Sequence, residues 1–205
     1  MPLTIATDFI YLASQSPRRS QLLDQLGVRH ELLLPDPDED AEALEKVWPN
    51  EAPKNYVRRV TGLKLAAAQQ RLERRQLPPA LILCADTTVA LGMTIFGKPE
   101  SADDAKRILR SLSNRPHRVT TAIALGLGER QTSACSESWV TFADMGEQDI
   151  DAYVATGEPM GKAGAYAVQG RAAAHIAQIS GSYSGIMGLP LYETAQALRT
   201  LGFSF

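Results

Sequence analysis

One short run of residues limits the possible folds more than any other feature of this 205-residue chain. Residues 81–85, Leu-Ile-Leu-Cys-Ala, are all apolar, and the carboxylate Asp86 follows them directly. A short run without polar alternation is typical of a strand that is buried on both faces of a sheet.

The rest of the chain predicts helices and strands in an irregular order. Ser16 is a favourable N-cap, Pro17 a favourable first helical residue and Gly27 a favourable end, so a helix is expected there. Ser101 with Asp104 indicates another helix start. The expected strands are 9–13, 81–85, 89–95 (bent at Gly92), 119–127, 136–142, 165–168 and 172–179; the further helices are 56–75, 102–112, 150–155 and 191–201.

The order of these elements lacks a strict βαβ rhythm. We therefore expect an α/β or mixed α+β fold with an internal cleft between two lobes. Residues 77–79, Leu-Pro-Pro, predict a tight connection rather than a linker, so residues 1–205 are interpreted as one domain. The acidic, proline-containing stretch 35–53 is expected to form a long surface loop.

Composition excludes several classes of protein. An apolar content of 44% argues against disorder, and 21 basic against 23 acidic residues leave no basic field for a nucleic acid. Two cysteines, Cys84 and Cys135, are too few for a disulfide framework. No apolar run reaches membrane-spanning length, and no signal-peptide pattern is present. We expect a cytoplasmic protein without a membrane or nucleic-acid partner.

The first candidate site lies where the first strand meets the first helix, at residues 14–19, Ser-Gln-Ser-Pro-Arg-Arg. A helix N-terminus presents free backbone N–H groups and binds anions. Arg18 and Arg19 are unfavourable there on dipole grounds unless an anion neutralises them, and arginine binds phosphate in a bidentate way. The alternative is a capped surface helix with solvated arginines.

Further candidates surround Asp86. Its carboxylate, at the expected end of a buried strand, could hold a divalent metal or take a proton from water; a turn-forming Asp is the alternative. Lys64 falls on the apolar face of its helix, so it either extends to solvent or points into a site. Lys98, in Gly-Lys-Pro, lies on a tight turn, where a solvated lysine is the usual outcome.

The last candidate is the glycine-rich stretch 161–170, which contains Lys162 and Gln169. Small residues allow a ligand to approach the backbone, and the amide of Gln169 can donate to and accept from the edge of a base. A glycine-rich hairpin is the alternative. The histidines, His30, His117 and His175, have no partner at metal-ligand spacing and are interpreted as structural.

These groups together combine anion-binding residues with carboxylates, and no nucleophile triad is evident. That combination suits a metal-assisted attack of water on a phosphate chain.

The chain also resembles the Maf family of nucleoside triphosphate pyrophosphatases from about residue 12 to residue 201. Several blocks occur in the order typical of that family, which is more specific than any single block. They are residues 13–19, ASQSPRR; 35–39, PDPDE; 85–89, ADTTV; 97–99, GKP; 157–159, GEP; 162–166, KAGAY; and 188–191, GLPL.

The resemblance implies a two-lobed fold like that of Maf and ITPase proteins, with a central mixed sheet and an active-site cleft. It implies a requirement for a divalent cation, Mg²⁺ or Mn²⁺, and hydrolysis between the α- and β-phosphates. By matching position, Asp86 would be the general base, Glu39 would help bind metal or orient water, and Lys64 would be catalytic as well as contacting phosphate. The substrate would be bound by Ser14, Arg18, Arg19, Thr87, Lys98, Lys162 and Gln169.

Two subgroups of the family are distinguished by their residues. Arg18, Thr87 and Gln169 match the dTTP/UTP pyrophosphatases, whereas the 7-methyl-GTP subgroup tends to have an aromatic residue, Gln and Glu at these positions. A nucleotide-binding regulator of cell division is the alternative from another class. A homodimer is possible by analogy with the family. The chain departs from the family pattern at Gly161, Asn114 and Gly185, which concerns fine positioning rather than the proposed base.

Overall fold

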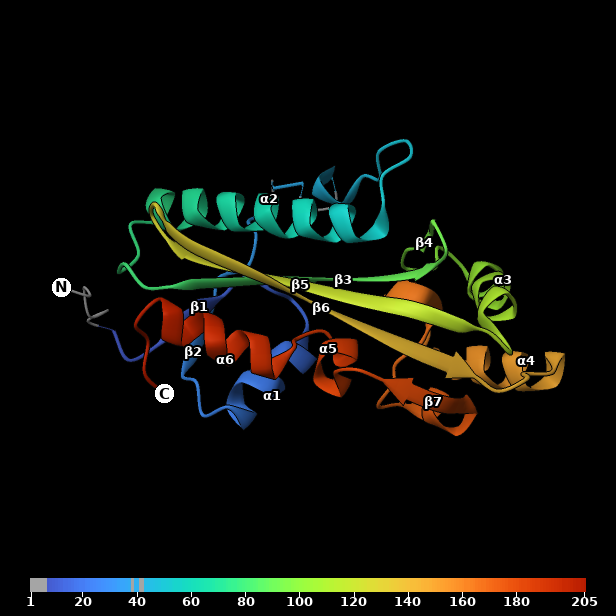
Figure 1. The fold of residues 1–205 in the computed structure, drawn as a ribbon. Helices are drawn as coiled ribbons and strands as arrows, with labels where there is room; N and C mark the ends of the chain where they lie inside the picture. The colour runs from blue at the N-terminus through green and yellow to red at the C-terminus, as the bar shows by residue number, and fades with distance from the viewer. Residues whose placement is uncertain (1–6, 38, 41–42) are drawn as a thin grey trace.

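The computed structural model describes residues 7–37, 39–40 and 43–205. Within these residues, strands form one seven-stranded sheet in the order β2-β1-β3-β5-β6-β7, with β4 pairing with β3 (Figure 1). Strand β1 pairs in parallel with β2 and β3, and the other pairs are antiparallel. The strands are β1 (Ile10–Leu12), β2 (His30–Leu32), β3 (Ile82–Leu91), β4 (Thr94–Phe96), β5 (Pro116–Leu127), β6 (Arg130–Phe142) and β7 (Ile176–Ser180).

Helices cover both faces of this sheet, so the run 81–85 is buried on both sides as expected. Figure 1 shows α2 on one face and α1 and α6 on the other. Ile82 and Cys84 pack in the cluster that contains α2, whereas Leu81 and Leu83 pack in the cluster that contains α1 and α6. The helices are α1 (Pro17–Gln25), α2 (Pro53–Arg74), α3 (Ala102–Leu112), α4 (Glu147–Ala155), α5 (Tyr183–Met187) and α6 (Leu191–Thr200), with 3-10 turns η1 (Ala43–Glu45), η2 (Ala163–Ala165) and η3 (Arg171–His175).

A second core lies at the far end of the long strands. The helices α3 and α4 pack against each other at that end (Figure 1), and their apolar residues join those of β5 and β6 in one cluster that includes Leu109, Phe142 and Tyr153. The expected mixed α/β fold with two lobes on a central mixed sheet is therefore confirmed. No helix in the described part of the chain is long and apolar enough to cross a bilayer.

Several local expectations were wrong. The strand expected at 81–85 continues to Leu91 because β5 pairs with it throughout, so Asp86 lies within the strand, opposite Ala122, and not at its end. The strand expected at 165–168 is absent. Ala165 is instead the last residue of η2, in which Gly164 adopts a φ of 72°, and residues 166–168 form no strand or helix. The strand expected at 172–179 begins only at Ile176, because η3 precedes it.

His117 lies in the second core, and the interpretation of this histidine as structural agrees with its position. Its side chain is fully buried, and its Nε2 atom lies 2.9 Å from the hydroxyl oxygen of Tyr166. Burial lowers the pKa of His117 to about 4. The neutral ring is therefore the form that the folded protein accommodates.

This pKa predicts a pH-dependent stability. In the unfolded chain His117 takes up a proton near pH 6.5, whereas in the folded protein it does so near pH 4. Its contribution is therefore complete above the unfolded pKa and is lost as the pH falls toward the folded pKa. Between pH 7 and pH 5 we expect a loss of about 2 kcal/mol. Urea unfolding at both pH values measures this loss of unfolding free energy. If His117→Gln loses the same amount between pH 7 and pH 5, His117 is not its cause.

Candidate active site

A cavity of about 850 Å³ opens beside β3, between the two lobes. This volume is within the usual range for small-molecule sites. Its walls come from the β1–α1 connection, the loop before α2, the turn at Lys98 and the segment around η2. Every residue that the sequence assigned to catalysis, metal or substrate lines this cavity: Ser14, Arg18, Arg19, Glu39, Lys64, Asp86, Thr87, Lys98, Lys162 and Gln169.

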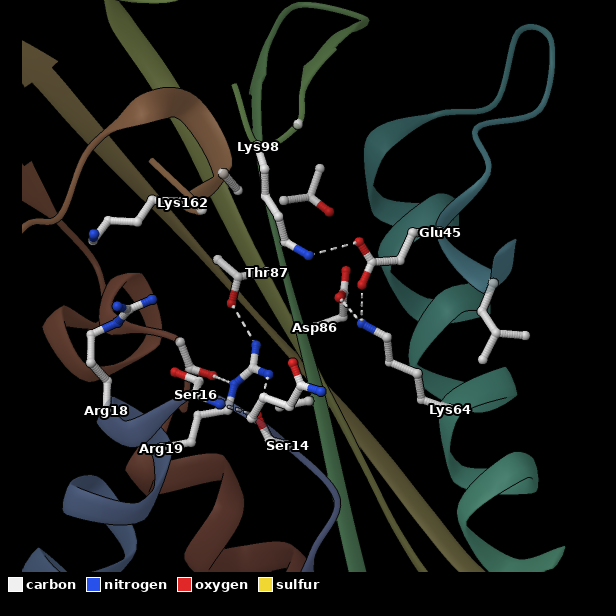
Figure 2. Close-up of a pocket in the computed structure, with 18 of the residues that line it drawn as sticks. Ser14, Ser16, Arg18, Arg19, Glu45, Lys64, Asp86, Thr87, Lys98 and Lys162 are labelled. Atoms are coloured by element: carbon white, nitrogen blue, oxygen red, sulfur yellow. Dashed lines mark hydrogen bonds and ion pairs between the residues drawn. The ribbon is translucent and has the colours of Figure 1, made fainter. Parts of the chain in front are cut away.

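Asp86 and Lys64 form the centre of the site. Lys64 reaches from α2 toward β3, and its Nζ donates to Asp86 Oδ1 over 2.6 Å (Figure 2). Burial raises the pKa of the Asp86 carboxyl above its ordinary value, although the charge of Lys64 opposes this. Burial alone would lower the pKa of Lys64, but the carboxylates of Asp86 and Glu45 outweigh it and raise that pKa. Lys64 is therefore a protonated cation beside a basic carboxylate.

Glu45 is a member of the site that the sequence did not indicate. Its Oε1 accepts from Lys64 Nζ over 2.7 Å, and its Oε2 lies 3.4 Å from Lys98 Nζ (Figure 2). Burial favours the neutral acid, but Lys64 and Lys98 outweigh this and lower the pKa of Glu45. The residue lies at the end of η1, in the acidic stretch that was expected only as a surface loop.

Arg19 joins three segments on the opposite wall. Its guanidinium donates to Gly188 O (2.8 Å), Ser14 Oγ (3.0 Å) and Thr87 Oγ1 (3.4 Å). Arg18 extends toward the cavity and donates to Met187 O over 3.4 Å (Figure 2). Burial lowers the pKa of both arginines, although Asp86 opposes this at Arg19.

The helix α1 begins at the residues that the sequence predicts. Ser16 occupies the N-cap position and Pro17 the first helical position, but the Ser16 side chain makes no capping hydrogen bond. Instead, the Ser16 N–H donates to Ser14 Oγ over 3.2 Å. The first N–H groups of a helix lack partners within it, so the helix start contributes donors next to Arg18 and Arg19.

The segment around η2 presents Lys162 and Gln169 to the same cavity. Lys162 Nζ donates to the Glu158 carbonyl. The Glu158 side chain accepts from Tyr153 Oη (2.8 Å) and from the Arg171 N–H (3.0 Å), which holds the turn that follows Gln169. Glu158 therefore fixes the positions of two candidate binding residues, a role that the sequence did not indicate.

Glu39 lies in a different part of the cavity wall. Arg71 donates to both of its carboxylate oxygens, and Arg74 donates to one of them. These bonds, led by that of Arg71, lower the pKa of Glu39 to about 2. Its carboxylate is thus held by two arginines rather than directed at Asp86. Asp38, in the same sequence block, lies outside the described residues.

A divalent cation is compatible with this set of donors. No group of three or more His, Cys, Asp or Glu side chains in the described ranges could hold a metal without help. Mg²⁺ usually binds one or two carboxylates together with substrate phosphates and water, so it does not need a full protein cage. Asp86 supplies a buried carboxylate for such a site. Glu39 could bind the cation only if its carboxylate left Arg71 and Arg74.

The backbone tolerates the residues found at the three positions, 114, 161 and 185, where the chain departs from the family pattern. Asn114 has a φ of 54° and Gly161 a φ of 71°, and asparagine and glycine are the residues that best tolerate this region. Gly185 donates its N–H to Ser182 Oγ, and a side chain there would lie 3.1 Å from Ser182. None of these residues contacts Asp86.

The fold and the cavity together define a class of protein: a mixed α/β protein whose cleft gathers basic side chains from several segments, suited to a polyanionic ligand, next to a buried carboxylate. The sequence profile of the family described as Maf-like protein matches residues 9–201. The chain belongs to the Maf family.

Relatives of known name are similar over almost their whole length. The dTTP/UTP pyrophosphatase of Albidiferax ferrireducens is 68% identical, with 96% of this chain and 98% of the relative covered. That of Cupriavidus metallidurans is 57% identical, with 97% and 100% covered. Among solved structures, the Ham1 protein of Staphylococcus aureus has 16% identity and a TM-score of 0.42, with 66% of this chain and 72% of that chain covered.

Proposed function

We propose that this protein is a nucleoside triphosphate pyrophosphatase that hydrolyses dTTP and UTP to the monophosphate and pyrophosphate. The observation that carries the proposal is the pairing of buried Asp86 with Lys64 in a cleft that is also lined by Arg18, Arg19, Lys98 and Lys162. Similarity to relatives named dTTP/UTP pyrophosphatase supports the choice of substrate.

In the proposed reaction, Asp86 takes a proton from a water molecule as its oxygen attacks the α-phosphorus. The bond between that phosphorus and the α–β bridging oxygen breaks, and pyrophosphate leaves. Burial raises the pKa of Asp86, which makes the carboxylate a stronger base. Lys64 keeps the carboxylate oriented through the 2.6 Å hydrogen bond, and its charge would stabilise a phosphate bound beside Asp86.

The other cations bind the phosphate chain. Lys98 and Lys162 approach the cavity from different segments, and Arg18, Arg19 and the first N–H groups of α1 form the remaining wall (Figure 2). A divalent cation held by Asp86, and by Glu39 if it is released from Arg71, would supply charge neutralisation of the phosphates. Thr87 connects β3 to Arg19 and so holds the arginine beside the carboxylate.

Arg18 and Gln169 support a pyrimidine rather than a 7-methylguanine substrate. The methylated purine is cationic, so a neighbouring arginine repels it, whereas an aromatic residue would stack on it. Gln169 lines the cavity and can pair with both a carbonyl and the N–H of uracil or thymine.

The test of this proposal is a panel of nucleotides. Purified protein is assayed for pyrophosphate release from dTTP, UTP, GTP and 7-methyl-GTP, with Mg²⁺, with Mn²⁺ and with a chelator. Metal-dependent release that is fastest with dTTP or UTP is the expected result. Faster turnover of 7-methyl-GTP would overturn the substrate assignment, and tight binding without release would favour a nucleotide-binding regulator.

Gln169→Glu is expected to reduce kcat/KM for UTP and dTTP by about tenfold or more, equivalent to about 1.4 kcal/mol. An ionised glutamate has no donor, so one carbonyl of the base loses its partner. GTP should suffer less, because the N1–H and amino group of guanine can donate to a carboxylate. Measuring kcat/KM for UTP and for GTP, on the variant and on the original protein, gives the UTP-to-GTP ratio, which should fall in the variant.

The matched control for this variant is Gln178→Glu, which makes the same change at an exposed position on β7. It should leave both substrates unaffected. If Gln169→Glu lowers the melting temperature and slows both substrates equally, Gln169 only supports its turn and does not contact the base.

Three further inferences accompany the proposed activity. Residues 1–205 act as one domain, the protein works in the cytoplasm where nucleoside triphosphates are abundant, and it forms a homodimer. Sedimentation of the purified protein tests the last of these.

A further inference from the structure

The Glu45 carboxylate contacts two lysines that the proposed function assigns to the phosphate chain. Lys64 and Lys98 approach the cavity from α2 and from the turn after β4, and the Glu45 carboxylate lies between them, 2.7 Å and 3.4 Å away. Figure 2 shows this carboxylate above Asp86, with both ammonium groups directed at it. A carboxylate and a phosphate present similar charged oxygens to an ammonium group.

The segment that carries Glu45 is held against α2 by a second set of contacts. Tyr56 Oη donates to the Glu45 carbonyl over 2.9 Å. The Arg59 guanidinium donates to both carboxylate oxygens of Glu51 at 2.7 Å and to Lys46 O at 2.9 Å. It also stacks on Trp48, 3.9 Å from the ring centroid. We call the contacts of Arg59 with residues 46–51 the Arg59 clamp.

Glu45 and a bound phosphate chain would compete for the same two lysine side chains. Lys64 directs donors at both Asp86 and Glu45, and Lys98 directs one at Glu45, so phosphate oxygens would compete with Glu45 for these ammonium groups. A triphosphate beside the Glu45 carboxylate would also experience like-charge repulsion. The Arg59 clamp makes displacement of Glu45 more costly, because its bidentate and stacking contacts must loosen when the segment moves.

We propose that Glu45 is an internal competitor for the phosphate chain, so that nucleotide binds only as the Glu45 carboxylate leaves Lys64 and Lys98. This regulation rests on the proposed function, because it assigns those lysines to phosphate. The Arg59 clamp then sets how readily the site opens. Affinity for polyphosphate is lower than the lysines alone would give.

The experiment measures binding of inorganic tripolyphosphate by calorimetry, first with a chelator and then with Mg²⁺. Glu45→Gln keeps the size of the side chain and removes its charge. It should tighten tripolyphosphate binding by about tenfold in both conditions. The matched control is Glu100→Gln, which removes the same charge from an exposed side chain two residues beyond Lys98 and should change binding little.

The clamp provides a second variant. Arg59→Lys keeps the positive charge but loses the bidentate geometry and most of the stacking. It should also tighten binding, and adding it to Glu45→Gln should produce no further gain, because both changes act on one event. Melting temperatures of all variants confirm that they are folded.

Unchanged or weaker binding by Glu45→Gln, in either condition, overturns the proposal. Weaker binding that occurs only with Mg²⁺ would assign Glu45 to cation binding instead. Binding of tripolyphosphate does not depend on hydrolysis, so a failure of the enzyme to release pyrophosphate from dTTP or UTP is a separate result that concerns the proposed function.

Discussion

Asp86→Asn is expected to reduce hydrolysis of dTTP and UTP by roughly 100- to 10,000-fold while nucleotide still binds. The amide is nearly isosteric with the carboxylate, but it cannot accept a proton from water at neutral pH. It also removes the negative partner of Lys64, which lies 2.6 Å from Asp86 Oδ1. Steady-state kcat and the dissociation constant of a non-hydrolysable nucleotide, measured on the same preparation, separate the two effects.

The matched control for this variant is Asp144→Asn, at an exposed position in the connection between β6 and α4. It should retain the activity of the original protein. If Asp86→Asn keeps activity within about threefold, well short of what removing a general base costs, Asp86 is not the base.

Gly164→Ala is expected to lower the free energy of unfolding by about 2–5 kcal/mol. Gly164 has a φ of +72°, a conformation that costs an alanine about 1–2 kcal/mol. An added Cβ would also lie 2.8 Å from both methyl groups of Val89 on β3. The Gly164 N–H donates to Gly97 O over 3.1 Å, so the turn cannot simply move away. Urea unfolding gives the change.

Gly161→Ala separates strain from overlap. Gly161 has a similar φ of +71°, but no atom lies within 4 Å of the position of an added Cβ. This variant should therefore lose only about 1–2 kcal/mol. Equal losses in the two variants would show that the contact with Val89 contributes nothing.

The parts of the site that were predictable from the sequence depend on local patterns. Lys64 could be singled out because it occurs on the apolar face of a helix, and Arg18 and Arg19 because they follow a helix start. Both inferences need only the spacing of residues within one element. The resemblance to the Maf family added Glu39 to the predicted site residues, and it rested on the order in which the sequence blocks occur.

The parts that were not predictable depend on contacts between distant segments. Asp86 was assigned to a strand end, but pairing with β5 continues the strand past it. The strand expected at 165–168 does not form: Ala165 ends a 3-10 turn in which Gly164 adopts a positive φ and bonds to Gly97. Glu45 has no local pattern at all, since only the positions of Lys64 and Lys98 give its carboxylate a role.

The hydrogen bond from Arg19 to the Gly188 carbonyl joins residues 169 positions apart. During synthesis, the start of α1 leaves the ribosome long before residue 188 does. The arginine wall of the cleft therefore cannot assemble on a nascent chain until residue 188 has emerged. A chain that terminates before residue 188 would contain Asp86 and Lys64 but would lack the carbonyl that positions Arg19. Incomplete translation products should consequently be unable to consume nucleotides.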